Sequence, residues 1–177
     1  MTKGPGELSP GPFVSVPAVK LGMVSGIAIR EATREDRGGV TALVQYVLSV
    51  EYGRSIDFDV SDADLIDFPT AYSDGAFWVA ELDGAVVGTV GISAGELGVA
   101  KLRKMYLAPE VRGRGLGRRL LEVSIAEARR RGFLEIRLET MSTMVAAIGL
   151  YESAGFRPVE AVPESPRCDR VYVLGLA

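Results

Sequence analysis

The chain contains several short stretches in which hydrophobic and polar residues alternate, as they do in half-buried β-strands. Between two of these stretches, Asp83-Gly84 is a dipeptide typical of a two-residue hairpin turn. Strands are therefore predicted over residues 27–32, 76–82, 85–93, 99–107 and 134–140, near 156–161 and near 169–176. We expect residues 76–107 to form an antiparallel meander.

Other stretches carry hydrophobic residues at three- and four-residue spacing, which indicates amphipathic helices. Thr33 and Asp36 have the spacing of a capping box at the start of the first helix. The hydrophobic face of this helix is predicted to consist of Val40, Leu43, Val44, Val47 and Leu48. A second helical stretch follows Ser61 and runs from Asp64 to Tyr72, with an interruption at Pro69.

Two more helices are predicted in the second half of the chain. One follows a glycine-rich segment and ends near Gly132, with Arg118–Glu122 and Glu127–Arg131 as surface ion pairs. Its hydrophobic side is predicted to carry Leu116, Leu120, Leu121, Ile125 and Ala128. The other runs from 144 to 154 and stops at Gly155, which can adopt a left-handed conformation. This order of elements predicts an α+β fold with helices packed on the faces of a mixed sheet.

Composition limits the organisation of the chain. Residues 1–26 are rich in Gly, Pro and Ser and are predicted to form a flexible arm. The chain has 177 residues, of which 47% are hydrophobic, so we interpret residues 27–177 as one domain with its own core. The apolar runs are short and interrupted by prolines, which predicts neither a signal peptide nor a membrane span.

Charge and the absence of histidine exclude several classes of function. The net charge of −3 gives no overall attraction to nucleic acid. The chain has no histidine, which excludes a Ser-His-Asp triad, a Cys-His pair and an imidazole-rich zinc site. Cys168 is the only cysteine, so no internal disulfide can form, which fits a reducing cytoplasm. No metal site is predicted.

Glycines at 113, 115 and 117 lie between a predicted strand and a predicted helix. Glycine lets the backbone approach a ligand closely, and the first N–H groups of a helix lack internal partners, so this segment can bind an anion such as a pyrophosphate. Arg112 and Arg114 add positive charge. The spacing fits neither a P-loop nor a dinucleotide fingerprint. The alternative is a tight turn with solvated arginines.

Arg112-x-x-Gly115-x-Gly117 resembles the pyrophosphate-binding motif of the GNAT N-acetyltransferases. The residues from 147 to 156, Ala-Ile-x-Leu-Tyr-Glu-x-x-Gly-Phe, resemble a second motif of that family. The resemblance spans roughly residues 27–176. It implies a mostly antiparallel mixed sheet of about seven strands flanked by about four helices.

The resemblance also implies a cofactor site. Acetyl-CoA, as cosubstrate, would lie where the strand at 101–107 splays from the strand at 134–140, with its pyrophosphate on the N–H groups of residues 112–118. The cofactor-binding residues expected on this basis are Met105, Tyr106, Leu107, Arg112, Gly113, Arg114, Gly115, Leu116, Gly117 and Arg118. Tyr151, in the second motif, would protonate the leaving thiolate as a catalytic acid. The alternative for Tyr151 is a core position on the helix face that it shares with Met144 and Ile148.

Two positions depart from the family pattern. Met144 replaces an Asn that many members carry, and Lys101 lies where some members have a glutamate. The general base is therefore open, with Glu139 and Glu96 as candidates. Glu51 and Tyr52 are candidates for lining the acceptor side, and Tyr106 has a weaker claim to direct participation. Cys168 and Trp78 are expected to have no part in the chemistry, with Trp78 in the core.

The sequence thus predicts a cytoplasmic N-acetyltransferase that transfers an acetyl group to a primary amine, with a small molecule as the preferred acceptor. The alternatives are a protein or peptide N-acetyltransferase and a non-catalytic acetyl-CoA sensor. Residues 44–75 are expected to determine the acceptor. A homodimer that pairs through an exposed final strand is also expected.

Overall fold

The computed structural model describes residues 23–24 and 26–177, and most of the predicted arm over 1–26 lies outside these residues. The end of that arm has regular structure, because strand β1 (Met23–Val24) pairs antiparallel with β2 (Ile27–Glu31). Ordered structure therefore begins before Ile27, the first residue of the predicted domain.

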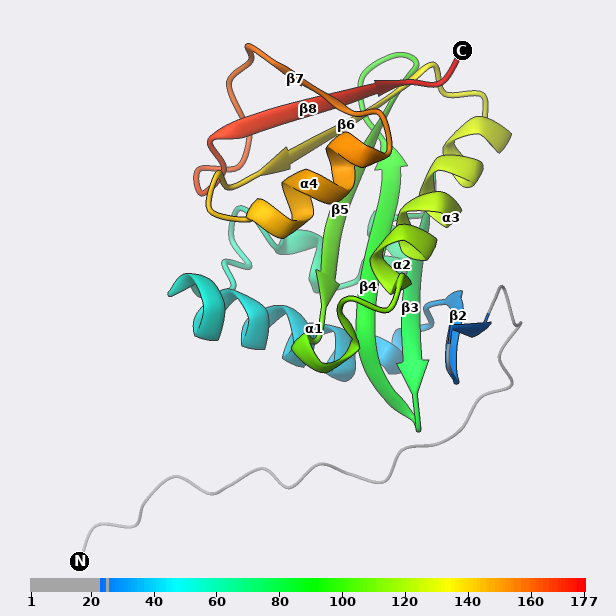
Figure 1. Ribbon diagram of the computed structural model, residues 1–177, viewed down its shortest axis with the longest axis vertical. Coiled ribbons are helices and arrows are strands. Elements are labelled where there is room, and N and C mark those ends of the chain that lie inside the picture. Colours follow the sequence, from blue (N-terminus) through cyan, green and yellow to red (C-terminus); the bar gives the residue numbers. More distant parts are fainter. Residues whose placement is uncertain (1–22, 25) are drawn as a thin grey trace, which may run out of the picture.

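The strands form one mixed sheet in the order β1-β2-β3-β4-β5-β6-β8-β7 (Figure 1). The remaining strands are β3 (Ala76–Leu82), β4 (Ala85–Ala94), β5 (Val99–Leu107), β6 (Glu135–Thr140), β7 (Arg157–Val159) and β8 (Arg170–Gly175). Only the β5–β6 pair is parallel among the described strands. The mostly antiparallel mixed sheet and the hairpin turn at Asp83-Gly84 are confirmed, and the two-residue β1 is an addition to the predicted strands.

The main helices are α1 (Arg37–Tyr46), α2 (Phe68–Ala71), α3 (Leu116–Arg130) and α4 (Val145–Ser153). Short 3₁₀ turns lie at η1 (Arg34–Asp36), η3 (Ala63–Leu65) and η4 (Pro109–Val111), and the π-helical segment η2 (Val47–Glu51) continues α1. The capping box is confirmed, since the Thr33 N–H donates to the Asp36 carboxylate at 2.7 Å. The predicted helix over 64–72 is wrong in extent: Pro69 lies in the first turn of the four-residue α2, where a missing N–H is tolerated.

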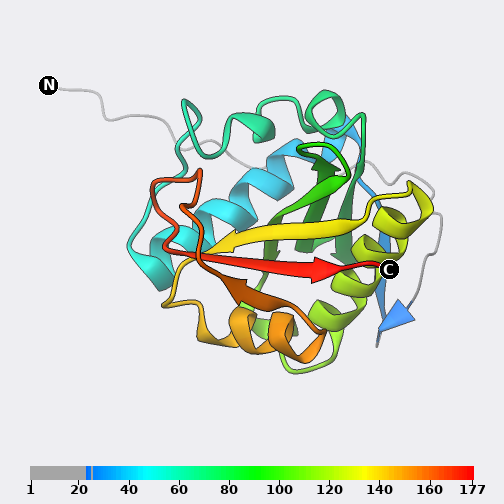
Figure 2. The same ribbon diagram turned by 90° about the horizontal axis from the view of Figure 1, so that it is seen from above.

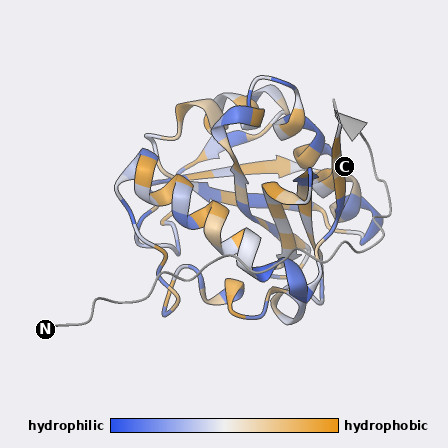
Figure 3. Cartoon of the chain, turned by 90° about the horizontal axis from the view of Figure 1, so that it is seen from below, coloured by the Kyte–Doolittle hydropathy of each residue, from blue (hydrophilic) through white to orange (hydrophobic). Residues whose placement is uncertain are grey.

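Helices cover both faces of the sheet (Figure 2). One buried cluster packs residues of α1 and α2 against β3, among them Val40, Val44 and Phe77. The other includes Leu116 and Leu120 of α3, packed beneath the opposite face. Hydrophobic and hydrophilic residues alternate along the helices (Figure 3). This is typical of helices that pack one face against a sheet and expose the other face to solvent.

The surface of α3 differs from expectation in one ion pair. Glu122 pairs with its i,i+3 neighbour Arg119 at 3.2 Å instead of with Arg118. The Glu127–Arg131 pair forms at 2.6 Å as predicted.

The final strand is not at an edge of the sheet. β8 lies between β6 and β7, and β7 pairs with the outer side of β8 over Val171–Val173. The expectation of a fully exposed final strand is therefore wrong, because the short β7 covers part of that strand. The dimer itself stays a prediction. Trp78 is 2% exposed, which confirms its place in the core.

β5 and β6 diverge partway along their length. Pairing runs from Val99 opposite Glu135 to Leu102 opposite Leu138 and then ends, although β5 continues to Leu107. A bulge in β5 lies at this point, where Lys104 adopts a left-handed conformation with φ of 54°. The divergence opens the sheet beside residues 105–107.

Candidate active site

The glycine loop presents a row of free backbone donors. Gly113 and Gly115 have φ of 72° and 81°, a region that side chains disfavour, and α3 begins immediately after Gly115. Between Arg112 and Arg119, whose N–H donates to the Gly115 carbonyl at 3.1 Å, no backbone N–H donates to a described residue. Donors of this kind at a helix N-terminus suit a diphosphate.

These donors border a cavity of about 360 Å³ between the end of β5, the start of α3 and α4. Most of the predicted cofactor-binding residues line it, namely Met105, Tyr106, Leu107, Arg112, Gly113, Gly115, Gly117 and Arg118. We call it the cofactor cavity after this prediction. Arg114 is exposed and outside this lining, while the Leu116 side chain is buried in the core and leaves only its backbone to the loop. Leu150 and Ala147 of α4 give the opposite wall an apolar surface.

Arg112 has partners within the protein. Its guanidinium donates to both carboxylate oxygens of Glu51, at 2.8 and 2.6 Å, and to the Leu107 carbonyl at 2.6 and 3.1 Å. The hydrogen bonds to Glu51 raise the pKa of Arg112. Glu51, expected on the acceptor side, therefore holds the loop to the end of η2, and the backbone N–H groups remain as donors for a ligand.

Three tyrosines line the cofactor cavity: Tyr52, Tyr106 and Tyr151. Tyr151 projects from α4 and is 5% exposed, with its ring 5.9 Å from that of Phe156. Burial raises the pKa of Tyr151 and of Tyr106 well above the ordinary value for a tyrosine. Both hydroxyls therefore stay protonated at neutral pH and can act as hydrogen-bond donors. Tyr52, expected on the acceptor side, lies in the cofactor cavity.

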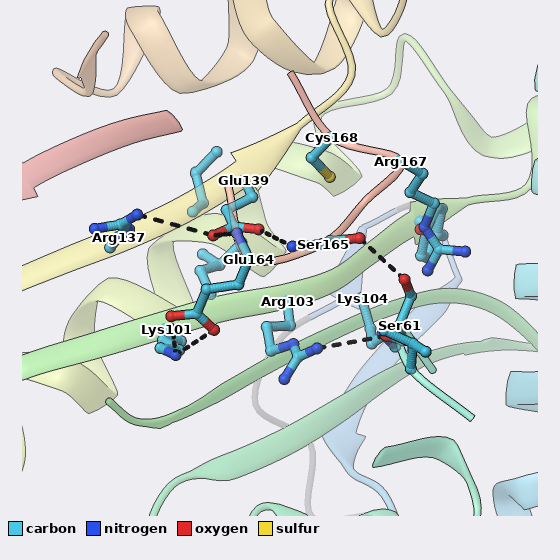
Figure 4. Close-up of a pocket in the computed structure, with 14 residues that line it drawn as sticks. Ser61, Lys101, Arg103, Lys104, Arg137, Glu139, Glu164, Ser165, Arg167 and Cys168 are labelled. Atoms are coloured by element: carbon cyan, nitrogen blue, oxygen red, sulfur yellow. Dashed lines mark hydrogen bonds and ion pairs between the residues drawn. The ribbon is translucent and has the colours of Figure 1, made fainter. Parts of the chain in front are cut away.

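A second cavity of about 310 Å³ shares one lining residue, Tyr106, with the first. Its walls come from β5, β6, the segment at 60–61 and the loop between β7 and β8 (Figure 4). Much of this lining is charged, including Lys101, Arg103 and Arg137. This cavity was not predicted from the sequence, because alternating charges on strands look like an ordinary solvated face.

The expected base candidates have different surroundings. The two carboxylate oxygens of Glu139 accept the backbone N–H groups of Glu164 and Ser165, at 2.8 and 2.9 Å, so this side chain holds the β7–β8 loop over the second cavity. Glu96 is exposed in the turn between β4 and β5 and lines neither cavity. Lys101 is bound by Glu164 at 2.6 and 2.7 Å.

A buried ion network fixes the segment around residue 62 beneath the second cavity. Asp62 is fully buried and accepts hydrogen bonds from Arg167 at 2.6 Å and from the Asp57 N–H at 2.9 Å. Lys104 lies 3.0 Å from Asp62 and 3.1 Å from Asp64. Burial opposes ionisation of Asp62, but its cationic partners prevail and lower its pKa.

Met144 and Cys168, two further positions considered in the sequence, each line one of the two cavities. Met144 lines the cofactor cavity, where its sulfur accepts the Thr140 hydroxyl at 3.6 Å. Cys168 lines the second cavity, and burial raises the pKa of its thiol, which disfavours a reactive thiolate. Among residues 23–24 and 26–177, no group of His, Cys, Asp and Glu side chains is arranged to hold a metal ion. No helix in this part of the chain has the length and apolar character to cross a membrane.

Comparison with known proteins identifies the family of this chain. Residues 46–156 match the acetyltransferase (GNAT) family. The chain is 35% identical over 139 residues to YjgM of Escherichia coli K12, an uncharacterised N-acetyltransferase, covering 75% of this chain and 83% of that protein. It is 38% identical over 107 residues to camello of Xenopus tropicalis, a probable N-acetyltransferase, and covers 56% of this chain and 49% of that one.

Solved structures agree with the family match. A GNAT acetyltransferase from Staphylococcus aureus superposes with a TM-score of 0.79 at 25% identity, over 85% of this chain and 99% of that one. The acetyltransferase yncA of Salmonella typhimurium, solved with acetyl-CoA, superposes with a TM-score of 0.67 at 25% identity, over 86% of this chain and 95% of that one. The predicted fold is confirmed, and this chain belongs to the GNAT acetyltransferase family of acyltransferases.

Proposed function

We propose that this protein transfers the acetyl group of acetyl-CoA to the primary amine of a small molecule. The observation that carries the proposal is the row of free N–H donors over residues 113–118, beside a cavity that shares Tyr106 with a second cavity. Family membership and the acetyl-CoA-bound Salmonella structure support acetyl-CoA as the acyl donor. The second cavity, at about 310 Å³, is of a size that suits a small acceptor.

The cofactor cavity has the chemistry that a CoA thioester needs. The loop N–H groups and Arg118 suit a diphosphate, and the apolar wall formed with Leu150 suits a pantetheine arm. At Gly117, an added Cβ would lie 3.1 Å from the Leu150 side chain, so a larger residue would narrow the cavity here. These observations support the assignment of Met105, Tyr106, Leu107 and residues 112–118 to cofactor binding, with Leu116 and Arg114 contributing backbone only.

The proposed reaction is direct attack in a ternary complex. The neutral amine nitrogen attacks the thioester carbonyl, and the carbon–sulfur bond breaks. The sulfur takes a proton from Tyr151, and the proton that the acylated nitrogen then loses passes through water to the Tyr151 phenolate. Holding both reactants in adjoining cavities supplies much of the rate without a covalent enzyme intermediate. Tyr151 suits the acid role because burial keeps it protonated at the cavity wall.

No predicted carboxylate base is free for the amine. Glu139 holds backbone N–H groups, and Glu96 lies outside both cavities. We therefore propose that the amine gives its proton to water before it attacks. Catalysis then depends on the fraction of acceptor that is already neutral.

The proposal is tested by measuring free thiol when acetyl-CoA is mixed with the protein and a panel of small amines and peptides. We expect thiol release with small primary amines and none above background with peptides. Efficient turnover of peptides would establish the alternative of a protein or peptide acetyltransferase. Thermal stabilisation by CoA without thiol release from any acceptor would establish a sensor.

A further inference from the structure

The second cavity carries more positive charge than its carboxylates neutralise, although the whole chain has a net charge of −3. Its cationic lining residues are Lys101, Arg103, Lys104, Arg137 and Arg167. The carboxylates that line it or pair with these cations are Asp62, Asp64, Glu139 and Glu164. Five cations against four carboxylates leave one positive charge in the cavity.

Three of the five cations are already held by close partners. Lys101 is bound by both oxygens of Glu164, at 2.6 and 2.7 Å. Lys104 and Arg167 share the buried Asp62, at 3.0 and 2.6 Å, and their side chains are only 4% and 14% exposed. These three cations therefore contribute little free charge to the cavity.

Arg103 is different, because its contacts are long. One terminal nitrogen lies 3.4 Å from the Ser61 carbonyl and Nε lies 3.8 Å from Asp64, while the side chain is 38% exposed. Most of its N–H groups donate to no residue in the described part of the chain. An arginine in this state can present its planar fork to an anion.

Arg137 is the second cation with only long contacts. Its terminal nitrogen lies 3.3 Å from the Val162 carbonyl and 3.9 Å from Glu139, whose oxygens are occupied by backbone N–H groups. Arg137 pairs in register with Lys101, and Arg103 lies two residues further along β5 on the same face (Figure 4). The two arginines thus stand on neighbouring strands of one cavity floor.

We propose, on the basis of the function proposed above, that the acceptor amine also carries a carboxylate, which Arg103 binds with support from Arg137. A single carboxylate matches the surplus of one positive charge, whereas a phosphate dianion exceeds it. With the anion at these arginines, the amine end of the acceptor points toward Tyr106, the residue that lines both cavities. The substrate class is therefore amino acids and related amino carboxylates.

The experiment compares matched acceptors in the thiol-release assay. β-Alanine is paired with β-alaninamide and lysine with lysinamide, while phosphoethanolamine is paired with ethanolamine to test phosphate instead. Because an amide has a different amine pKa, rates are compared per neutral amine. We expect kcat/KM for at least one carboxylate to exceed that of its amide by about tenfold or more. Equal rates for carboxylates and amides would overturn the proposal, and a preference confined to phosphoethanolamine would replace the carboxylate with a phosphate.

Binding gives a readout that needs no turnover. In the presence of CoA, millimolar propanoate or β-alanine should raise the melting temperature of the wild-type protein. The Arg103→Gln/Arg137→Gln variant should lose this shift and the carboxylate preference, while retaining its response to CoA. The control, Arg129→Gln/Arg157→Gln, removes the same charge from exposed positions outside both cavities and should keep both. If carboxylates stabilise the Arg103→Gln/Arg137→Gln variant as well as wild type, or fail to stabilise wild type, the proposal fails, even where amine turnover upholds the acetyltransferase function.

Discussion

The carboxylate of Glu51 accepts two hydrogen bonds from the guanidinium of Arg112, at 2.8 and 2.6 Å. This contact joins the π-helical end of α1 to the glycine loop ahead of α3. The same guanidinium donates to the Leu107 carbonyl at the end of β5. Arg112 thus connects three elements around the cofactor cavity and fixes the loop whose backbone donors face it.

Replacing Arg112 with alanine should weaken acetyl-CoA binding by about tenfold, because the loop loses its charge-assisted contacts and its N–H groups lose their fixed direction. Glu51→Gln should produce part of the same effect. If Arg112 acts through Glu51, the double variant should bind no more weakly than Arg112→Ala alone. Calorimetric titration with CoA measures all four proteins, and additive losses would contradict the coupling.

Global stability should change little in these variants. The Arg112 and Glu51 side chains are 39% and 22% exposed, so solvent screening limits the pair to less than about 1 kcal/mol. Urea denaturation therefore separates a weaker cofactor site from an unfolded protein.

Tyr151→Phe should lower kcat by on the order of 10²-fold and leave the affinity for CoA nearly unchanged, because only the proton donor is removed. Tyr172→Phe is a matched control. Its hydroxyl donates to Glu152 at 3.1 Å, it is equally buried, and it lines neither cavity. Unchanged kcat in the Tyr151 variant would remove this residue from the acid role.

The pH dependence of kcat/KM follows from the same assignment. Below the pKa of the acceptor amine, near ~10 for an alkyl amine, the rate should rise about tenfold per pH unit because only the neutral amine attacks. Burial raises the pKa of Tyr151, so the acid remains protonated throughout this range. A rate profile measured from pH 6 to 10 should show no descending limb. A fall between pH 7 and 9 would assign the acid to another group.

Asp62 should make the protein less stable in acid. Its pKa is lowered in the folded state, so its contribution to stability is present above the unfolded pKa of about 3.9 and is lost as the pH falls through the lower folded value. Asp62→Asn should cost about 3–5 kcal/mol at pH 7, because Lys104 and Arg167 lose a buried partner.

Urea denaturation between pH 3 and 7 measures this effect. The Asp62→Asn variant should lose less stability than wild type as the pH is lowered. Glu122→Gln, which breaks an exposed pair with Arg119, serves as the control and should leave the pH dependence unchanged. A wild-type pH dependence in the Asp62 variant would contradict the sign of the pKa shift.

The sequence predicted the elements whose causes are local. The capping box at Thr33, the hairpin turn at Asp83 and the glycine stop at Gly155 depend on residues a few positions apart. The glycine loop could be located for the same reason, because close backbone approach and free N–H groups require that spacing.

The basic cavity could not be predicted, because its charges come from distant segments. Arg103, Arg137 and Arg167 belong to β5, β6 and the β7–β8 loop, and each looks like an ordinary surface charge in its own segment. Lys104 likewise adopts a left-handed conformation, although lysine disfavours it. Nothing in the neighbouring sequence indicates this conformation. The place of β8 inside the sheet depends on strand order, which hydrophobic alternation does not encode.

The central claim is that the backbone donors over residues 113–118 bind the diphosphate of acetyl-CoA. The most direct test is calorimetric titration of CoA into Gly115→Val and Gly132→Val. Both glycines have a left-handed backbone, with φ of 81° and 79°, and an added Cβ has nothing within 4 Å at either position, but only Gly115 lies in the loop. We expect Gly115→Val to lose at least about tenfold in CoA affinity and Gly132→Val to bind like wild type. Equal affinity in the two variants would contradict the claim.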